Sequence, residues 1–373
     1  MVDKMIVCLM KYILCILLFP YLVISCSQEK STHLGNEFLA FIHSIEEVKS
    51  SQNIIAKDSN LQVVMHLFTT SSGRIIVVEG QSWNLHLKDK EGNAIAVAGG
   101  YGRGPGEFEL INHAYLSDDD VLHILDSRLM RVTKYSFHKD QPELMSVTNL
   151  PNYEMRLEKF FPLTDGNYVG VFSENLPRTA GSFYNTVYHL DENYEQTKKV
   201  NRFFGGEMIS LRGSLIVDEL SARSVWLFYK DKLFYSRSDS FQVRMVSSEE
   251  DYLIQVDSPL NEIPAFRNDE YIQNNIGIHL ENIFSMLPEF KVHFEELETF
   301  TYFTQVLIEN GTAYFNIFNP VGSPGIILKY NLETSETTFI RTPPMFDLKQ
   351  VFDNEIFGID QTKGVNEIVS IRF

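Results

Sequence analysis

The amino-acid sequence predicts an all-β fold, a six-bladed β-propeller whose blades have four strands each. Two observations lead to this prediction. The 373 residues include 28 phenylalanines and 17 tyrosines, and aromatic residues favour strands. A short apolar strand followed by a partner strand also recurs six times, with 47, 47, 57, 88 and 42 residues between successive starts. This spacing is typical of propeller blades, with two intervals lengthened by insertions.

Each unit is built around one of these recurrent apolar strands. The six recurrent strands are expected at residues 75–79, 122–126, 169–173, 226–230, 314–318 and 356–360. The strands expected before them are residues 61–68, 108–116, 157–163, 209–217, 300–308 and 348–352. The partner strands expected after them are residues 83–88, 131–137, 185–190, 233–237, 326–330 and 367–373. A polar turn and a short outer strand complete a unit, as residues 336–340 do in the fifth.

The sixth unit stops after its third strand, at Phe373. Because an open strand edge favours aggregation, a propeller has to close, and we expect residues 53–57 to supply the missing outer strand. The alternative is a loose helix within residues 37–57, where four apolar residues have helical spacing. Both descriptions can hold for different parts of that segment. The four residues are Phe38, Phe41, Ile42 and Ile45.

The first 25 residues have the features of a secretion signal. Lys11 precedes an apolar run over residues 12–24, which is shorter than a comfortable membrane span. The run ends in Leu-Val-Ile-Ser-Cys at residues 22–26, which resembles the lipobox of bacterial lipoproteins. The resemblance implies cleavage before Cys26, a lipid on Cys26 and a cell-envelope location, on the periplasmic side of a membrane or in the outer membrane. An uncleaved transmembrane anchor is the alternative, and Met10 is a second candidate start.

Charge and cysteine content exclude several functions. The net charge of −17 repels phosphate backbones, so no nucleic-acid partner is expected. The three cysteines, Cys8, Cys15 and Cys26, all lie at the start of the chain. The rest of the chain therefore has no disulfide framework, thiol nucleophile or cysteine-based zinc site, and no cofactor is predicted. Residues 26–36 are polar and form the expected tether to the propeller of residues 37–373.

Residues 99–108, Gly-Gly-Tyr-Gly-Arg-Gly-Pro-Gly-Glu-Phe, are the most specific motif. Together with the strand at 122–126 and the stretch 128–131, this motif resembles an NHL-type propeller repeat. It is also similar to six-bladed propeller lipoproteins of Gram-negative envelopes, in which a Gly-Pro-Gly-Glu-Phe turn precedes a blade. The resemblance covers residues 99–137 and implies a fold, since one propeller scaffold hosts many activities. A nucleotide-binding loop is not expected, because a strand and not a helix follows.

Long loops are expected to gather on one face of the propeller. Loops between successive blades share a face with loops between the second and third strands of a blade. Residues 99–107, 173–184, 319–325 and the insertion at about 248–298 belong to these two loop types. The insertion is expected to be partly helical and to form either a packed brace between blades or a lid over the channel. This face is therefore the expected functional surface.

The candidate ligand-binding residues lie in or beside these loops. Aromatic side chains suit stacking on sugars, whereas arginines and carboxylates suit polar ligands; loop packing or surface solvation is the alternative for each. The candidates are Tyr101, Arg103, Glu107, Asp126, Arg128, Arg178, Phe183, Tyr184 and Asn319. No catalytic residue or metal site is predicted. Asp118, Asp119 and Asp120 lack calcium-loop spacing, and His113 and His123 are expected to be ordinary sheet residues.

Three functions remain open from the sequence. The first is a non-enzymatic envelope protein that binds a glycan, a peptide or a partner protein on the elaborated face. The second is a propeller-type hydrolase or lyase, which would need buried, convergent ionisable groups at the channel mouth. The third is a scaffold subunit of an envelope complex, which would need a broad exposed apolar patch.

Overall fold

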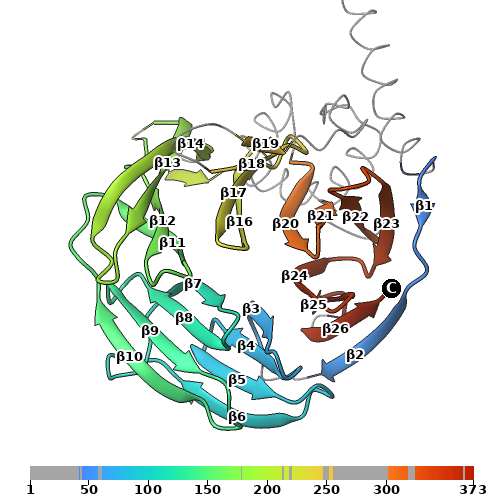
Figure 1. Cartoon of the computed structure of the whole chain (residues 1–373), viewed down its shortest axis with the longest axis horizontal. Coiled ribbons are helices and arrows are strands. Elements are labelled where there is room, and N and C mark those ends of the chain that lie inside the picture. Colours follow the sequence, from blue (N-terminus) through green and yellow to red (C-terminus); the bar gives the residue numbers. More distant parts are fainter. Residues whose placement is uncertain are drawn as a thin grey trace, which may run out of the picture.

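The computed structural model describes residues 42, 44–57, 61–177, 179–211, 214–217, 221–246, 252–254, 301–317, 324–363 and 366–373. Six β-sheets are arranged in a ring around a central channel, each with one strand edge toward the axis (Figure 1). The predicted all-β, six-bladed propeller with four-stranded blades is thus confirmed. Within the described residues, no helix is long and apolar enough to span a membrane.

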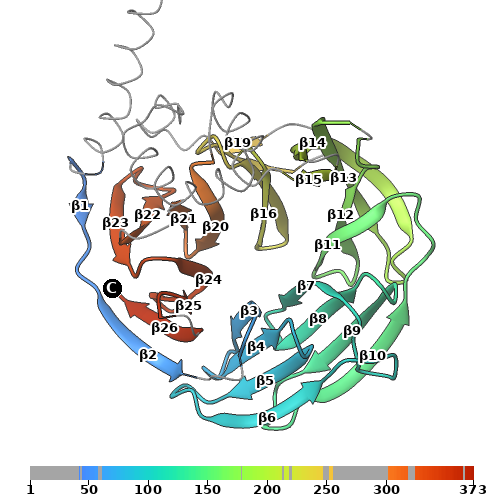
Figure 2. The same cartoon turned by 180° about the vertical axis from the view of Figure 1, so that it is seen from behind.

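The blades follow one another in chain order, each running from the channel outward (Figure 2). Blade one is β3 (Val64–Thr69), β4 (Ile75–Glu79), β5 (Asn84–Lys88) and β6 (Ala94–Gly99); blade two is β7 (Ile111–Leu116), β8 (Val121–Asp126), β9 (Arg131–Ser136) and β10 (Glu143–Asn149). Blade three is β11 (Arg156–Pro162), β12 (Tyr168–Ser173), β13 (Gly181–Leu190), β14 (Gln196–Leu211) and β15 (Ser214–Val217).

The other three blades complete the ring. Blade four is β16 (Ser224–Tyr229), β17 (Lys232–Arg237), β18 (Val243–Met245) and β19 (Tyr252–Ile254); blade five is β20 (Phe303–Glu309), β21 (Thr312–Ile317), β22 (Gly325–Asn331) and β23 (Thr337–Thr342). Blade six is β24 (Phe346–Phe352), β25 (Glu355–Asp360), β26 (Glu367–Arg372) and β2 (Ser51–Lys57). The second strands β4, β8 and β12 are buried along their whole length, as expected for strands covered by a neighbouring blade on each face.

The two ends of the chain meet in blade six, as predicted. β2 pairs antiparallel with β26 and supplies the missing outer strand, so the last sheet has four strands. The alternative helix has support only at Ile42 and Ser44, because residues 37–41 lie outside the described part of the chain. Ile42 is buried against blade-five residues such as Phe339, and β1 (Glu46–Glu47) pairs parallel with β23.

The prediction that residues 209–217 form the innermost strand of blade four is wrong. β14 continues to Leu211 as part of blade three, and β15 folds back on it as a hairpin. The innermost strand of blade four is instead β16, which contacts the inner strand β20 of blade five. The side-chain alternation of a hairpin extension is the same as that of a new blade, so the pattern did not distinguish the two. Gly205 and Gly206 permit the extension, because a Cβ at Gly205 would lie 2.6 Å from the ring of Phe183.

The two faces of the ring differ in their connections. Turns of two to five residues join the first and second strands of each blade, on the side we call the turn face. The opposite side, the loop face, carries the connections between blades and those between second and third strands. Residues 100–110, residues 174–180 and the β14–β15 hairpin extend from this face. Of the predicted insertion at 248–298, only β19 is described, and its other residues lie outside the described part of the chain.

Candidate functional site

The loop between blades one and two is shaped by its glycines and one phenylalanine. Gly106 has a φ of 82°, a left-handed conformation that favours glycine, and a Cβ there would collide with the Tyr135 hydroxyl. That hydroxyl donates to the Gly106 carbonyl over 3.0 Å. Phe108 is fully buried between blades one and two, and an isolated bridge joins it to Tyr101. The ring of Tyr101 is 67% exposed on the loop.

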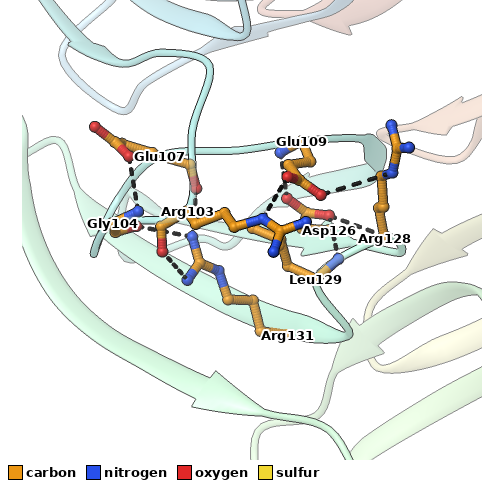
Figure 3. A network of polar contacts seen from close by, with 8 residues as sticks. All are labelled: Arg103, Gly104, Glu107, Glu109, Asp126, Arg128, Leu129 and Arg131. Atoms are coloured by element: carbon orange, nitrogen blue, oxygen red, sulfur yellow. Dashed lines mark hydrogen bonds and ion pairs between the residues drawn. The ribbon is translucent and has the colours of Figure 1, made fainter.

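The side chains of the candidate residue Glu107 and of Arg131 hold this loop in place (Figure 3). A carboxylate oxygen of Glu107 accepts the backbone N–H of Gly104 at 2.7 Å. The buried guanidinium of Arg131 donates to the carbonyls of Arg103, Gly104 and Glu107 at 3.1, 2.8 and 2.6 Å. Glu107 therefore closes its own turn, and Arg131, which the sequence analysis did not single out, fixes the loop to β9.

Asp126 lies at the end of β8, beneath the loop, and is fully buried. Its carboxylate accepts backbone N–H groups of Glu109 (2.8 Å), Arg128 (3.0 Å) and Leu129 (2.9 Å). Both oxygens accept backbone donors and the side chain is fully buried, so the carboxylate is not accessible to a ligand on the surface. The geometry thus gives Asp126 the role of joining two connections of the loop face.

Glu109 forms ion pairs with the two candidate arginines, Arg103 and Arg128. One oxygen of its carboxylate accepts a hydrogen bond from Arg103 Nε at 2.6 Å, and the other lies 3.6 Å from Arg128 Nε. The hydrogen bond from Arg103 lowers the pKa of Glu109 from its usual value, and the charges of Arg103 and Arg128 add to this. The Glu109 side chain is 9% exposed, whereas those of Arg103 and Arg128 are 78% and 66% exposed. We call Arg103 and Arg128 the guanidinium pair.

Sequence reasoning missed Glu109, although a signal was present. Glu107, Phe108 and Glu109 alternate around a buried aromatic ring, so both carboxylates turn away from the core. A carboxylate beside two arginines of neighbouring connections would then be a natural ion-pair partner.

Phe183 and Tyr184 belong to a different group, in blade three. Phe183 packs against the backbone of Gly205 and Gly206. The guanidinium of Arg202 lies 3.6 Å from the centre of the Tyr184 ring and makes two hydrogen bonds to Glu174, at 2.8 and 2.9 Å. These aromatic side chains are thus engaged within the β13–β14 hairpin, apart from the guanidinium pair of the first two blades.

The structure leaves some predicted residues untested and gives the histidines ordinary surroundings. Arg178, Asn319 and Cys26 lie outside the described residues, as do the signal at 1–25 and the tether at 26–36. His113 Nε2 lies 3.0 Å from the Phe160 carbonyl, and His123 is buried beside aromatic rings. Among the described residues, no three His, Cys, Asp or Glu side chains gather as a metal site would require.

Comparison with known proteins identifies the fold. No curated protein matches the chain. A protein of Bacteroides fragilis described as exported is 11% identical over 88% of this chain and 98% of its own, with a TM-score of 0.52. Virginiamycin B lyase of Staphylococcus aureus is 10% identical over 87% of this chain and all of its own, with a TM-score of 0.44. A Bacteroides caccae protein of unknown function is 12% identical, covering 82% and 86% of the two chains, with a TM-score of 0.40.

These similarities, all at low identity, concern the fold alone. A family described as 6-bladed beta-propeller matches residues 54–294 by its sequence model. That match extends over more than half of the sequence and agrees with the six sheets of the structure. The chain belongs to this family of six-bladed β-propellers.

Proposed function

We propose that this protein is a cell-envelope lipoprotein, anchored through Cys26, which binds an acidic glycan or an acidic peptide on its loop face. The observation that carries the binding proposal is the guanidinium pair, two exposed arginines oriented by one nearly buried carboxylate. The lipobox resemblance at residues 22–26 supports the anchor.

The guanidinium pair has hydrogen-bonding capacity to spare. Both arginines use Nε to reach Glu109. Their terminal NH2 groups have no hydrogen bond or ion pair within the described residues. A planar guanidinium binds a carboxylate, sulfate or phosphate group through parallel N–H donors. Two such groups on one face of an acidic protein favour a ligand that carries negative charge.

The neighbouring aromatic ring fits the same ligand classes. Tyr101 is exposed two residues before Arg103, on a loop that Arg131 and Phe108 hold rigid. An exposed tyrosine stacks on sugars or packs on peptide side chains at low entropic cost. Pre-organised donors beside a flat ring are typical of binding sites in which rigidity reduces the ordering cost of association.

The polar groups of the loop support binding better than catalysis. The carboxylates of Glu107 and Asp126 are occupied by backbone N–H groups, and that of Glu109 by two arginines. A general base needs a carboxylate or imidazole free to take a proton from substrate. The loop therefore presents donors without a free base.

The proposal is tested with a fragment of residues 27–373, which keeps every strand of the six sheets. We expect it to bind oligosaccharides rich in uronic acid, or acidic peptides, more tightly than their neutral counterparts. The double variant Arg103→Ala/Arg128→Ala should weaken binding by about tenfold or more, since each arginine provides a charge-assisted contact. Arg372→Ala is the matched control, because Arg372 is similarly exposed and paired with Glu355. Equal affinity of the double variant and the unaltered fragment would contradict the proposal.

The anchor is tested separately in a Gram-negative host. The full chain should partition into detergent and incorporate labelled fatty acid, whereas Cys26→Ser should do neither. Lipid incorporation into Cys26→Ser would contradict lipidation at this residue.

A further inference from the structure

The inner strands of the propeller share an irregularity that aligns their side chains. In five blades the pairing of the first and second strands shifts by one residue, a β-bulge, at or before the middle of the inner strand. The residue after each bulge lines the central channel. These residues form a polar level, His66, His113, Lys159, Gln305 and Gln350. β16 of blade four has no bulge, and Trp226 lines the channel there.

A second level lies two residues further along each strand, on the side of the turn face. Since side chains alternate along a strand, these residues also line the channel. They form an apolar level, Phe68, Tyr115, Phe161, Phe228, Leu307 and Phe352. The rings of Phe161 and Phe228 stack with centres 5.2 Å apart, and Tyr115 meets each of them edge-on at 5.6 Å.

The two levels enclose a cavity of about 590 Å³, which falls within the usual size of small-molecule pockets. Its lining continues from the polar level past the apolar level to the turns at Ser71, Asp118 and Asn310. The cavity therefore extends toward the turn face, away from the guanidinium pair.

Among the described residues, the two lysines at the polar level differ in whether they have a partner. Lys349, beside Gln350, pairs with Asp347 at 2.7 Å and donates to the Met65 carbonyl at 3.1 Å. Gln350 accepts from the Thr69 N–H, and His113 meets the Phe160 carbonyl. Lys159 has no hydrogen bond or ion pair within the part of the chain that the structure describes. Burial lowers its pKa, which shows that the channel wall solvates its charge poorly.

Among the neighbours of Lys159, the carboxylate of Glu158 opposes the lowering of the lysine pKa but forms no ion pair with it. Burial, together with the charges of Lys349 and Lys159, lowers the pKa of His66 to about 3, so His66 is neutral near pH 7. Burial and Lys159 likewise keep His113 neutral. The carboxylate of Glu158 is engaged by Arg156 and Asn112. With Lys349 paired, Lys159 is left without an ion-pair partner among the described residues.

The cavity mouth restricts the charge of a ligand. Asp118, Glu309 and Lys230 line it at the turn face, and burial together with Asp118 raises the pKa of Glu309. Two carboxylates against the one ammonium of Lys230 repel a polyanion more strongly than an ion with a single charge. An apolar body gains from the aromatic level that lies behind them.

From these features we propose that the central cavity binds a small organic monoanion, with its carboxylate on Lys159 and its flat or aliphatic body within the apolar level. This site is independent of the ligand proposed for the loop face. An unpaired ammonium inside a protein is costly, and a bound carboxylate would supply the missing partner.

The test uses the 27–373 fragment and 3-phenylpropanoate as the probe, with 3-phenylpropanamide as its neutral counterpart. The chain has two tryptophans, so Trp83→Phe leaves Trp226, which lines the cavity, as the fluorescent reporter. We expect the acid to change Trp226 emission and to bind about tenfold or more tightly than the amide, by fluorescence and calorimetry. Lys159→Met should remove that preference, whereas Lys139→Met, at an exposed lysine, should keep it.

Equal affinities for acid and amide, absence of binding, or an acid preference that survives Lys159→Met would each overturn the proposal. Loss of binding in Arg103→Ala/Arg128→Ala with normal binding in Lys159→Met would place the anion on the loop face, and would also overturn it. Because the acid–amide comparison needs no substitution at Lys159, it remains decisive if that variant fails to fold.

Discussion

Charged side chains occur in both the blade one–two loop and the central channel, but their surroundings differ. In the loop, Asp126 and Arg131 are buried and most of their polar atoms meet backbone groups. In the channel, Lys159 lies among neutral histidines and aromatic rings without a partner in the described residues. A densely hydrogen-bonded network fixes the shape of the loop, whereas a charge in a cavity without a partner in the described residues points to a ligand.

The largest effect is expected from removing Asp126, the centre of the loop network. Asp126→Ala should lower the free energy of unfolding by about 3 kcal/mol or more, because three backbone N–H groups lose their acceptor. Urea unfolding of the 27–373 fragment measures this. Asp140→Ala, at a carboxylate whose side chain is 80% exposed, should change the value by less than about 0.5 kcal/mol. A loss below about 1 kcal/mol for Asp126→Ala would mean that the network does not hold the loop.

Acid should weaken the packing around the buried histidines. Burial lowers the pKa of His123 to about 4 and that of His66 to about 3, from a usual value of 6.5. Below about pH 6.5 the unfolded chain therefore binds more protons than the folded chain. The contribution of these histidines to the unfolding free energy is fully present above that pH and is lost as the pH falls toward 4.

The expected size of this effect is up to about 2 kcal/mol for His123 between pH 7 and 5. His123→Gln should flatten the dependence of the unfolding free energy on pH, whereas His138→Gln, at an exposed histidine, should not. An unchanged slope in His123→Gln would show that this ring is protonated in the folded protein.

A smaller difference in unfolding free energy is expected between variants of the two channel lysines, Lys349 and Lys159. Lys349→Met breaks an ion pair and a hydrogen bond, and should cost about 1 kcal/mol. Lys159→Met removes an unpartnered charge, so without ligand the unfolding free energy should stay level or rise by about 1 kcal/mol. Thermal and urea unfolding of both variants measure the contrast. Destabilisation by Lys159→Met equal to that of Lys349→Met would indicate a structural partner for Lys159.

The smallest expected effect concerns the guanidinium pair. Arg103→Ala and Arg128→Ala should each change the unfolding free energy by less than about 1 kcal/mol, since exposed ion pairs contribute little. Their effect should appear in binding and not in folding. A loss above about 2 kcal/mol would assign the pair a structural role like that of Arg131.

Strand positions were largely predictable from the sequence, because burial in a stack of sheets imposes a local pattern of apolar and alternating residues. The recurrent strands such as β4, β8 and β12 matched expectation closely, and β2 closes blade six as predicted. The error at residues 209–217 arose because local alternation does not say which sheet a strand joins. The extension of β14 depends on the contact of Gly205 and Gly206 with Phe183, which lies more than twenty residues away in the chain.

The candidate site was only partly predictable. The motif at residues 99–108 located the loop. The sequence did not show that Glu107 and Asp126 bind the backbone of the loop while Arg103 and Arg128 are exposed. Their difference depends on which backbone N–H groups surround each carboxylate, and those groups come from two connections of the loop face. Glu109 and Arg131 were missed for the same reason.

By itself, then, the sequence determined the all-β class, the six repeats, the closing strand and the loop on which Arg103 and Tyr101 lie. These follow from periodicity and turn chemistry, which act over a few residues. Tertiary structure alone decided that five bulges bring His66, His113, Lys159, Gln305 and Gln350 to one level of the channel. The groups that face Lys159 across the channel, such as His66 and His113, come from other blades, so the surroundings of its charge are a property of the closed ring.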